Sequence, residues 1–480
     1  MKPSDNYPKG DLKPTDKNPM ASPQHITVIA GDGIGQEVVD ATLQILDAAS
    51  APLNWVHCQA GEACFRNGIA TGVPEDTLAT IKQTKVVLKG PLSTPVGFGE
   101  RSANVYLRKY FGLFANVRPV KQYPNVPSLF KDTPIDLVVI RENIEDLYAG
   151  IEYSHQPGIA HSIKLISEYG CNYINTFAYE YAKLTQRKSI HCATKANILK
   201  KTEGMMKRSF EQLSTQYPGI NAKHMIIDNC AHQLVVNPSQ FDMIVTTNMN
   251  GDIISDLTSG LVGGLGIAPS ANIGQDVAMF EAVHGAAPDI AGQQLANPTA
   301  MILSAIMMCR YIGMDDVADT IEHALAKTFY DSKMTGDLNP TSALSTNAFT
   351  TAVIERLGDT CPGFTPSSFK PIHMPPISTP SIQPGTCHGI DVVIISDHSP
   401  TDIAHELNRI ATANGCEPVE LFNRGKAVHS PEKDQMISQW FCRFTSKHPP
   451  FDNHHILKLV NELSEHYHWA QIEKLCTFNE

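Results

Sequence analysis

Short apolar runs alternate with segments of helical periodicity through the first three quarters of the chain. The run at residues 25–30 leads into a glycine-rich turn, after which Val38, Val39, Leu43 and Leu46 recur at helical spacing. Further apolar runs, several of them separated by helical patterns, occupy residues 84–90, 135–142, 188–193, 224–229 and 241–248. This alternation predicts an α/β architecture with largely buried sheets.

The rest of the chain departs from this alternation. Residues 1–24 form a tail that is too polar to fold, and residues 151–172 predict an irregular or hairpin insertion. Seven prolines fall within the 28 residues from Asp359 to Thr386, which is typical of a linker or an extended wrapping arm. After residue 387 the pattern β-α-β-β-α-β predicts a ferredoxin-like α+β domain.

Composition and charge narrow the possible functions. A chain of 480 residues predicts two to four domains at roughly 150 residues each. A net charge of -11 leaves no global positive field that could bind nucleic acid or an anionic membrane. The sequence has neither an apolar run of the ~20 residues that cross a bilayer nor a signal peptide, so we expect a soluble, cytoplasmic protein. The 11 cysteines include no C-x-x-C pair and predict reduced thiols.

The first glycine cluster does not satisfy the dinucleotide-binding fingerprint. Gly31, Gly33 and Gly35 are followed by Gln36, where G-x-G-x-x-G requires a glycine. No acidic residue that could bind a ribose ends a second strand about 20 residues further on. The sequence therefore argues against a standard Rossmann site.

Basic residues gather in one segment of this acidic protein. Residues 89–118 contain one acid, Glu100, against four arginines and lysines beyond Lys89, namely Arg101, Arg108, Lys109 and Arg118. Arginine binds carboxylates bidentately, although a solvated basic helix face would give the same spacing. A further arginine, Arg141, ends an apolar strand, where site residues of open α/β sheets usually lie.

Two carboxylates lie one turn apart near the start of a predicted helix. Asp252 and Asp256 would repel each other unless a cation or basic side chains lie between them. Hard oxygen ligands suit Mg²⁺ or Mn²⁺, and Asp228, at the end of a predicted strand, could complete such a site. An acidic first helical turn is the alternative explanation.

Two residues could transfer protons, and one loop could bind a nucleotide. Lys195 follows a predicted strand and Tyr148 follows Arg141, and both side chains can carry protons when their surroundings tune the pKa. Taken singly, each is more often a surface or core residue. Consecutive backbone amides at residues 284–292 could hold a nucleotide, with a plain interdomain loop as the alternative.

Several segments occur in an order that is far more specific than any one motif. They are KGPLSTPVG, RSANVYLR, NVRP, RENIEDLYAGIE, NMNGDIISD, GLGIAPSANIG and HGAAPDIAG followed by NP. Residues 25–357 thereby resemble the metal-dependent β-decarboxylating dehydrogenases, the family of isocitrate and isopropylmalate dehydrogenases. Residues 388–480 are similar to the extra C-terminal domain of the longer bacterial isocitrate dehydrogenases in that family.

The resemblance implies the fold of that family, which is not a Rossmann fold, with an active cleft between two domains. The expected parts are a large domain (residues 25–113 and 263–357), a small domain (114–262) with a clasp near residues 150–172, a linker (358–387) and the C-terminal domain (388–480). That last domain would be either structural, in oligomerisation, or regulatory. Family sites combine residues from two protomers, which implies a homodimer or a higher homo-oligomer.

The implied activity is the oxidative decarboxylation of isocitrate to 2-oxoglutarate and CO₂ with reduction of NAD, a tricarboxylic acid cycle reaction. Ser102 and Asn104 are polar where isopropylmalate enzymes are apolar, so they could hydrogen-bond a third carboxylate. Homoisocitrate is the rival substrate that this argument excludes least well. A 3-isopropylmalate dehydrogenase and a non-catalytic regulatory subunit are excluded more strongly. Ser102 could also be a phosphorylation point.

The resemblance also assigns a cofactor. NADP-using isocitrate enzymes typically carry Lys-Tyr where this chain has Asp289-Ile290, and an aspartate there can accept hydrogen bonds from free ribose hydroxyls and would repel a 2′-phosphate. NAD is therefore expected. Lys89 and Thr94 would line the nicotinamide side, Asn297 would contact the adenine, and the adenosine side would be held by His284, Gly285, Ala286, Ala287, Pro288, Asp289 and Ile290.

The remaining roles follow from the same resemblance. Arg108, Arg118 and Arg141 would clamp the substrate carboxylates, with Ser102 and Asn104 on the third. Mg²⁺ or Mn²⁺ would be held by Asp252, Asp256 and Asp228 of the other subunit. Lys195, also from the other subunit, would help take the hydroxyl proton, and Tyr148 would protonate the carbon that loses CO₂.

Overall fold

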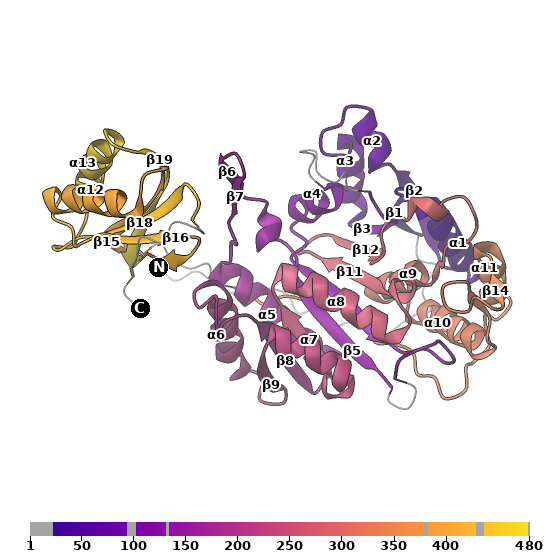
Figure 1. Cartoon of the computed structure of the whole chain (residues 1–480). Helices are drawn as coiled ribbons and strands as arrows, with labels where there is room; N and C mark the ends of the chain where they lie inside the picture. Colours follow the sequence, from indigo (N-terminus) through magenta and orange to yellow (C-terminus); the bar gives the residue numbers. More distant parts are fainter. Residues whose placement is uncertain (1–22, 94–101, 131–133, 378–382, 429–435, 479–480) are drawn as a thin grey trace, which may run out of the picture. The chain divides into compact units, whose positions relative to one another are not determined.

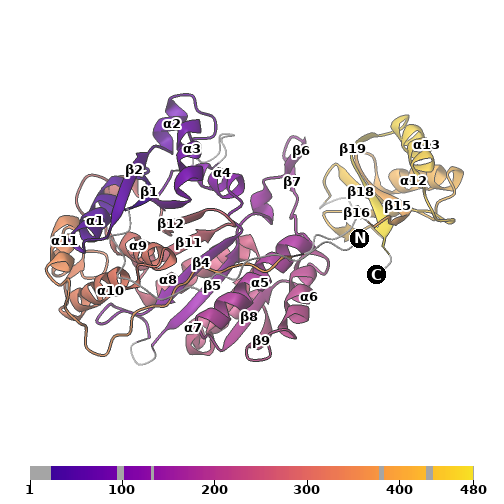
Figure 2. The same ribbon diagram turned by 180° about the vertical axis from the view of Figure 1, so that it is seen from behind.

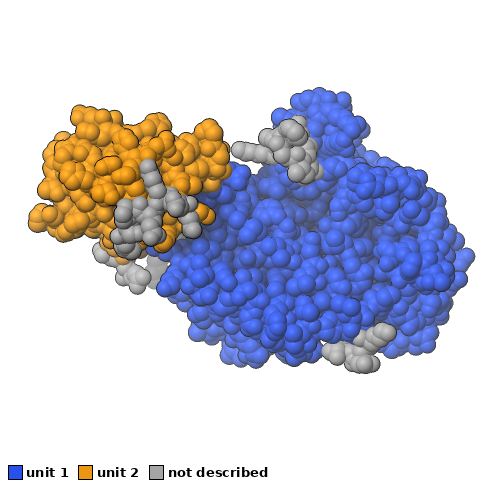
Figure 3. Space-filling model, viewed as in Figure 1, with its two compact units in different colours: residues 1–152, 162–378 blue, residues 153–161, 379–480 orange. Residues whose placement is uncertain are grey.

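The computed structural model describes residues 23–93, 102–130, 134–377, 383–428 and 436–478. Two compact units make up the chain, one of residues 1–152 and 162–378 and the other of residues 153–161 and 379–480 (Figure 3). Within the described ranges, no helix combines the length and the apolar character that crossing a bilayer requires. All 11 cysteines lie in these ranges and none forms a disulfide.

A ten-stranded mixed sheet forms the centre of the first unit (Figure 1). It is parallel apart from three antiparallel pairings in its middle, β12–β11, β11–β4 and β4–β5. The strand order is β2 (Leu53–Cys58), β1 (Gln24–Ile29), β3 (Val86–Lys89), β12 (Ala278–Ala282), β11 (Pro269–Ile273), β4 (Ala115–Lys121), β5 (Asp136–Glu142), β10 (Met243–Thr246), β8 (Ser189–Thr194) and β9 (Asn221–Ile226). This mixed sheet confirms the predicted α/β class. The segments expected to form the large and small domains both contribute strands to it.

Helices cover both faces of this sheet (Figure 1 and Figure 2). They are α1 (Gly35–Ala48), α2 (Glu62–Arg66), α3 (Glu75–Thr84), α4 (Ala103–Tyr110), α5 (Glu168–Leu184), α6 (Thr202–Ser214), α7 (Ile227–Val236), α8 (Asn248–Val262), α9 (Thr299–Tyr311), α10 (Asp315–Tyr330) and α11 (Thr346–Ile354). Two short strands, β13 (Met334–Thr335) and β14 (Ala343–Leu344), form a separate pair. Helix α9 is apolar around most of its surface and almost entirely buried, as a helix enclosed by sheet and helices must be.

The predicted strand around residues 224–229 is only partly correct. Strand β9 ends at Ile226 and helix α7 begins at Ile227, so Asp228 lies in the first turn of a helix and not at a strand end. An acid in the first turn interacts favourably with the N-terminal end of a helix, so Asp228 suits the helical position that it occupies.

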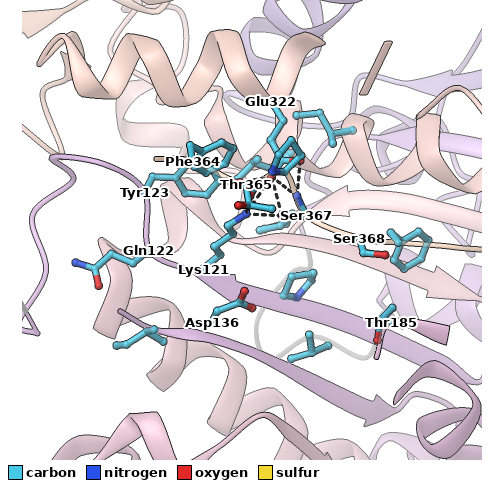
Figure 4. A pocket seen from close by; sticks show the side chains of 18 of the residues that line it. Lys121, Gln122, Tyr123, Asp136, Thr185, Glu322, Phe364, Thr365, Ser367 and Ser368 are labelled. Carbon is cyan, nitrogen blue, oxygen red and sulfur yellow. Dashed lines mark hydrogen bonds and ion pairs between the residues drawn. The ribbon is translucent and has the colours of Figure 1, made fainter. Parts of the chain in front are cut away.

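Part of the proline-rich segment forms an extended arm on the first unit (Figure 2). Cys361 and Phe369 are buried in the same apolar core as the sheet. The carboxylate of Glu322 on α10 has no solvent exposure and accepts the backbone N–H of Ser367 at 2.9 and 3.0 Å and its hydroxyl at 2.6 Å (Figure 4). From β4, Lys121 Nζ donates to the carbonyl oxygen of Thr365 at 2.5 Å. A buried carboxylate therefore holds this arm in place.

The second unit contains the antiparallel C-terminal sheet, in the order β17 (Lys426–Ala427), β16 (Glu420–Asn423), β18 (Gln439–Thr445), β15 (Thr386–Ile395) and β19 (His468–Thr477). Helices α12 (Pro400–Ala413) and α13 (Asn453–Ser464) pack their apolar faces on it. The β-α-β-β-α-β prediction is confirmed, with β17 as an additional short strand.

The predicted insertion contains a β-hairpin made of β6 (Glu152–Gln156) and β7 (Ile159–Ser162), and helix α5 then begins at Glu168. Residues 153–161 of the hairpin belong to the second unit. Gln439 of β18, which is buried, pairs with His161 Nε2 at 2.9 Å and with His155 Nδ1 at 3.2 Å. The His161 ring also stacks on Phe441 at a centroid distance of 5.5 Å. These contacts join the hairpin to the C-terminal sheet.

Candidate active site

A row of polar side chains crosses five neighbouring strands in the middle of the large sheet. Lys89 on β3 lies opposite Glu281 on β12, and Asn116 on β4 lies opposite both Asn272 on β11 and Arg141 on β5. Asn272 is two residues along β11 from the partner of Glu281, and so shares its face. All five residues are buried. Buried polar groups need partners, and here they supply one another.

Glu281 holds two cations on one side of this row. Its Oε2 lies 2.5 Å from Lys89 Nζ and its Oε1 lies 3.1 Å from a guanidinium nitrogen of Arg108, on α4. Burial alone would raise the pKa of Glu281, but the charges of Lys89 and Arg108 outweigh it and hold that pKa well below its usual value. Arg108 Nε is buried without a hydrogen-bond partner among the described residues, so this guanidinium can still donate to an anion.

Two more arginines converge on Asp252 from the other side of the row. Arg118 on β4 and Arg141 on β5 both contact Asp252 Oδ1, the first at 3.4 Å. Arg141 also donates twice to Asn248 Oδ1, at 2.7 and 3.0 Å, and Arg118 donates to Ser255 Oγ. Burial and the neighbouring charge of Arg141 lower the pKa of Arg118 to about 10, so the Arg118 guanidinium is cationic at neutral pH. The structure therefore brings the three predicted arginines to one polar network.

Tyr148 lies against this network as a proton donor. Its hydroxyl donates to Asp252 Oδ2 at 2.6 Å, and the guanidinium of Arg141 lies 5.0 Å from the centre of its ring. Burial, and then the hydrogen bond to Asp252, raise the pKa of the phenol. Tyr148 is therefore protonated at neutral pH and can give its proton to a basic carbon held nearby.

The two predicted metal ligands of α8 have the right chemistry but form an incomplete set. Asp252 and Asp256 side chains are 37% and 55% exposed, and Arg118 contacts both. Because α8 begins at Asn248, neither acid lies in its first turn, which removes the alternative explanation by the helix dipole. Among the described residues, no group of three or more His, Cys, Asp or Glu could hold a metal. These hard oxygens fit Mg²⁺ or Mn²⁺ if a further ligand comes from outside this set.

Lys195 and Asp228 form a pair apart from the arginine network. Lys195 Nζ contacts Asp228 Oδ1 at 2.5 Å, both side chains are solvent-accessible, and the hydrogen bond from Lys195 lowers the pKa of Asp228. None of the described arginines of the network contacts either residue. Exposed apolar side chains lie on the same and neighbouring segments, namely Ile198, Leu199, Val235, Val236 and Ile253. This arrangement is typical of a surface that another chain covers.

The predicted nucleotide-binding loop packs closely on the first glycine turn. Ile34 N donates to Ala286 O at 2.8 Å, and a Cβ on Gly33 would lie 1.9 Å from that oxygen, so only glycine permits this approach. His284 Nε2 is buried without a partner among the described residues, and the Asp289 side chain is exposed in the same loop. A free buried nitrogen and an open carboxylate are groups that a bound nucleotide could satisfy.

The other predicted site residues lie in different surroundings. Asn104 Oδ1 accepts from Lys89 Nζ at 2.9 Å, so it joins the polar network, and Ser102 lies directly before α4. Asn297 is buried and its amide donates to Asp337 Oδ2 at 2.9 Å. Thr94 lies outside the described residues. Gly285, Ala287 and Pro288 are exposed, while Ile290 is half-buried.

Sequence reasoning missed the residues that join these groups. Glu281, Asn272 and Asn116 were not candidates, although they lie in or beside segments that carry the resemblance. Asn116 is part of NVRP and Asn272 is part of GLGIAPSANIG, while Glu281 comes shortly before the 284–292 loop. An acid or amide inside an otherwise apolar strand was the available signal, because such a group is rarely buried without a function or a partner.

Comparisons with known proteins identify a family and several similar proteins. A family model described as isocitrate/isopropylmalate dehydrogenase matches residues 25–353, and one described as bacterial isocitrate dehydrogenase, C-terminal domain, matches residues 386–480. A Thermus thermophilus relative named as an NADP isocitrate dehydrogenase is 48% identical over 464 residues, which cover 95% of this chain and 93% of that protein. A Dictyostelium discoideum relative named as a mitochondrial NAD isocitrate dehydrogenase regulatory subunit is 43% identical over 324 residues, covering 67% of this chain and 89% of its own.

Two solved structures are similar as well. A crystal structure of a Thermus thermophilus protein gives a TM-score of 0.91 at 48% identity, covering 95% of this chain and 94% of that one. The crystal structure of isocitrate dehydrogenase from Methylococcus capsulatus gives a TM-score of 0.68 at 42% identity, covering 70% of this chain and 99% of that one.

Proposed function

Because the chain belongs to the isocitrate/isopropylmalate dehydrogenase family, whose enzymes use a divalent metal and a nicotinamide cofactor, we propose that it oxidises and decarboxylates isocitrate to 2-oxoglutarate and CO₂. The observation that carries the proposal is the convergence of Arg108, Arg118 and Arg141 on one buried polar network beside the start of α4. Three arginines offer forked donors to a polycarboxylate. Ser102 and Asn104 add polar groups that could hydrogen-bond a third carboxylate but not an isopropyl substituent.

The chain's own residues would bind the substrate and move its protons. The three arginines would clamp the carboxylates, while Asp252 and Asp256 would hold Mg²⁺ or Mn²⁺ together with Asp228 of the partner subunit. When bound, the metal would polarise the substrate hydroxyl, and the nicotinamide would accept a hydride from the carbon that bears this hydroxyl. Lys195 of the partner subunit would help take the hydroxyl proton. Tyr148 would protonate the carbon from which CO₂ has left. The pKa of its hydroxyl is raised, and this hydroxyl donates to Asp252.

A homodimer or higher homo-oligomer supplies the missing groups in this proposal. The described residues of one chain offer two metal-binding carboxylates and keep Lys195 and Asp228 in a separate pair. Exposed apolar side chains on α7, on α8 and after Lys195 give that pair a surface to bury against a second copy. Association of two copies through this surface would bring each pair to the other chain's arginines.

Steady-state kinetics with isocitrate, homoisocitrate and 3-isopropylmalate tests the substrate. We expect kcat/KM for isocitrate to exceed that for 3-isopropylmalate at least about 100-fold, since an apolar substituent cannot accept the hydrogen bonds that a carboxylate accepts at this position. Each substrate is measured with Mg²⁺, with Mn²⁺ and with a chelator, and turnover should be lost with the chelator. A preference for either rival substrate would contradict the proposal, and absence of turnover with all three would favour a regulatory subunit.

We propose NAD as the cofactor on the strength of Asp289. The Thermus thermophilus relative, which covers 95% of this chain, is named with NADP, whereas the Dictyostelium discoideum relative named with NAD covers 67%. The proposal of NAD therefore rests on Asp289 and not on these names. Asp289 is exposed in its loop, where it can accept hydrogen bonds from ribose hydroxyls and would repel a 2′-phosphate. No basic side chain stands at 289 or 290 to offset that repulsion.

Exchanging this dipeptide tests the cofactor. The double change Asp289→Lys with Ile290→Tyr should raise KM for NAD about tenfold or more, because a charged acceptor is lost, and should admit NADP. Initial rates with both cofactors measure the effect. Gln293→Lys provides a control that adds a cation to the same exposed loop and keeps the Asp289 carboxylate, although it removes the hydrogen bond from Gln293 Nε2 to Asp289 O. Unchanged NAD kinetics in the double variant, or a wild-type preference for NADP, would refute the assignment.

A further inference from the structure

Asn272 occupies the centre of the polar row and uses both ends of its amide. Its Nδ2 donates to Glu281 Oε1 at 2.8 Å and to Met279 O at 3.3 Å. Its Oδ1 accepts from Asn116 Nδ2 at 2.9 Å and from Asn143 Nδ2 at 3.0 Å. The side chain has no solvent exposure, so no bulk water can replace these partners. Asn272 therefore connects strands that carry opposite halves of the candidate site.

The direction of these hydrogen bonds is fixed from both ends. Arg118 Nε can only donate, and it donates to Asn116 Oδ1 at 2.6 Å. Asn116 must then present its NH₂ group to Asn272, which must present its oxygen in return. At the other end the ionised carboxylate of Glu281 can only accept, so it requires the NH₂ group of Asn272. The amides of Asn116 and Asn272 can therefore accept from Arg118 and donate to Glu281 only when each has the orientation described.

Both ends of this chain of hydrogen bonds control groups that the proposed reaction needs. Among the described residues, the guanidinium of Arg108 is held by Glu281 alone, and Glu281 Oε1 is shared between Arg108 and Asn272. Glu281 also pairs with Lys89, which is expected on the nicotinamide side. The hydrogen bond from Arg118 Nε to Asn116 Oδ1 orients the Arg118 guanidinium. If the amide of Asn272 were lost, Glu281 could rotate and Asn116 could flip, placing a donor against Arg118 Nε.

We propose that Asn272 is a positioning residue that sets the orientation of the arginine clamp, acting through Glu281 on Arg108 and through Asn116 on Arg118. This proposal rests on the proposed function, because the clamp binds the substrate carboxylates. Replacing Asn272 should therefore change the affinity for substrate, whereas replacing a buried asparagine with only a structural role should not. Arg141 contacts Asn248 and Asp252 instead, so its position should be independent of Asn272.

The isosteric variant Asn272→Asp tests the polarity of this hydrogen-bond chain. It replaces the donor that faces Glu281 with an acceptor and keeps the acceptor that faces Asn116. We expect KM for isocitrate to rise about tenfold or more, with a smaller fall in kcat, because the clamp acts in both the ground state and the transition state. Asn272→Ser introduces no charge and removes both links, so it should show the same split between KM and kcat even if the aspartate variant folds poorly.

Asn175→Asp and Asn175→Ser are matched controls. Asn175 is also without solvent exposure, but its amide donates to Met206 O and Ser209 Oγ between α5 and α6. These variants should lower Tm by amounts similar to the Asn272 variants and leave KM for isocitrate unchanged. KM within about twofold of wild type in both Asn272 variants, or an equal rise in the Asn175 variants, would overturn the proposal.

Crystal structures of wild type and Asn272→Ser separate this proposal from the proposed function. The guanidinium groups of Arg108 and Arg118 should move in the variant while that of Arg141 stays in place. If wild type turns over none of the substrates tested, the proposed function fails, and the side-chain positions still decide whether Asn272 orients the arginines. Arginines that keep their wild-type positions in the variant would refute the positioning role regardless of activity.

Discussion

Replacing Lys195 with Met should lower kcat by about 10²- to 10⁴-fold and change isocitrate binding far less. The expected loss is that of a positioned proton-transfer group, since Met is an unbranched side chain only one atom shorter than Lys and carries no charge. The backbone N–H of Lys195 donates to Glu203 at 2.9 Å, so the loop keeps an anchor that the substitution does not touch. Rapid-quench or steady-state rates measure kcat, and titration of the metal-bound enzyme with isocitrate measures binding.

A matched lysine separates this effect from loss of surface charge. Lys207 has a side-chain exposure of 35%, close to the 36% of Lys195, and also pairs with one carboxylate, that of Glu211. Lys207→Met should leave kcat within about twofold of wild type, because a single exposed ion pair contributes little. If Lys195→Met kept the wild-type kcat, the assignment of Lys195 to proton transfer would be wrong.

Mixed subunits test whether Lys195 acts across the dimer. A heterodimer of a Tyr148→Phe chain and a Lys195→Met chain would place both defects in one site and neither in the other if each site takes Lys195 from the partner. About half of the wild-type activity per heterodimer should then return. If Lys195 served its own chain, both sites would carry one defect and the mixture would stay inactive.

The sequence predicted the fold well where most residues of a strand are apolar. Strands β1, β3, β5, β8 and β10 all coincide with apolar runs, because a strand buried on both faces is mostly apolar; Lys89 and Arg141 lie at or next to the ends of β3 and β5. The central strands β4, β11 and β12 were not predicted from their pattern. They carry Asn116, Arg118, Asn272 and Glu281, and these polar residues interrupt the apolar run that identifies a buried strand. In β4, β11 and β12 the site residues therefore obscure the strand pattern, whereas Lys89 and Arg141 leave the apolar runs of β3 and β5 intact.

Some residues of the candidate site could be predicted from the sequence and others could not. Charged residues with a recognisable spacing, such as Asp252 and Asp256, could be found from the sequence because one helical turn brings them together. The contacts of Glu281 with Lys89 and Arg108 join residues 192 and 173 positions apart, and only the pairing of strands makes them neighbours. Local patterns contain no trace of such pairing. The family resemblance, which the comparisons confirm, supplied the site residues that spacing alone could not assign.

Replacing Glu322 with Ala should lower the free energy of unfolding by about 3 to 5 kcal/mol, because it leaves buried donors without a partner. Glu322 has no solvent exposure, accepts from Arg310 at 2.9 Å and from Tyr123 at 3.2 Å, and holds the arm through the backbone and hydroxyl of Ser367. Lys121, 3.7 Å away, would lose its nearest buried carboxylate. Denaturant unfolding measures the loss, and limited proteolysis should cleave residues 361–374 faster in the variant.

Two further variants locate the origin of that loss. Glu322→Gln keeps the volume and part of the hydrogen bonding, so it should cost less than alanine while still weakening the contacts with Arg310 and Lys121. Glu211→Ala removes a carboxylate from an exposed pair and should change stability by about 0.5 kcal/mol or less. Stability equal to wild type in Glu322→Ala would show that solvent enters and satisfies these donors. Destabilisation without faster cleavage of the arm would instead assign the effect of Glu322 to Arg310 and Tyr123 within the core.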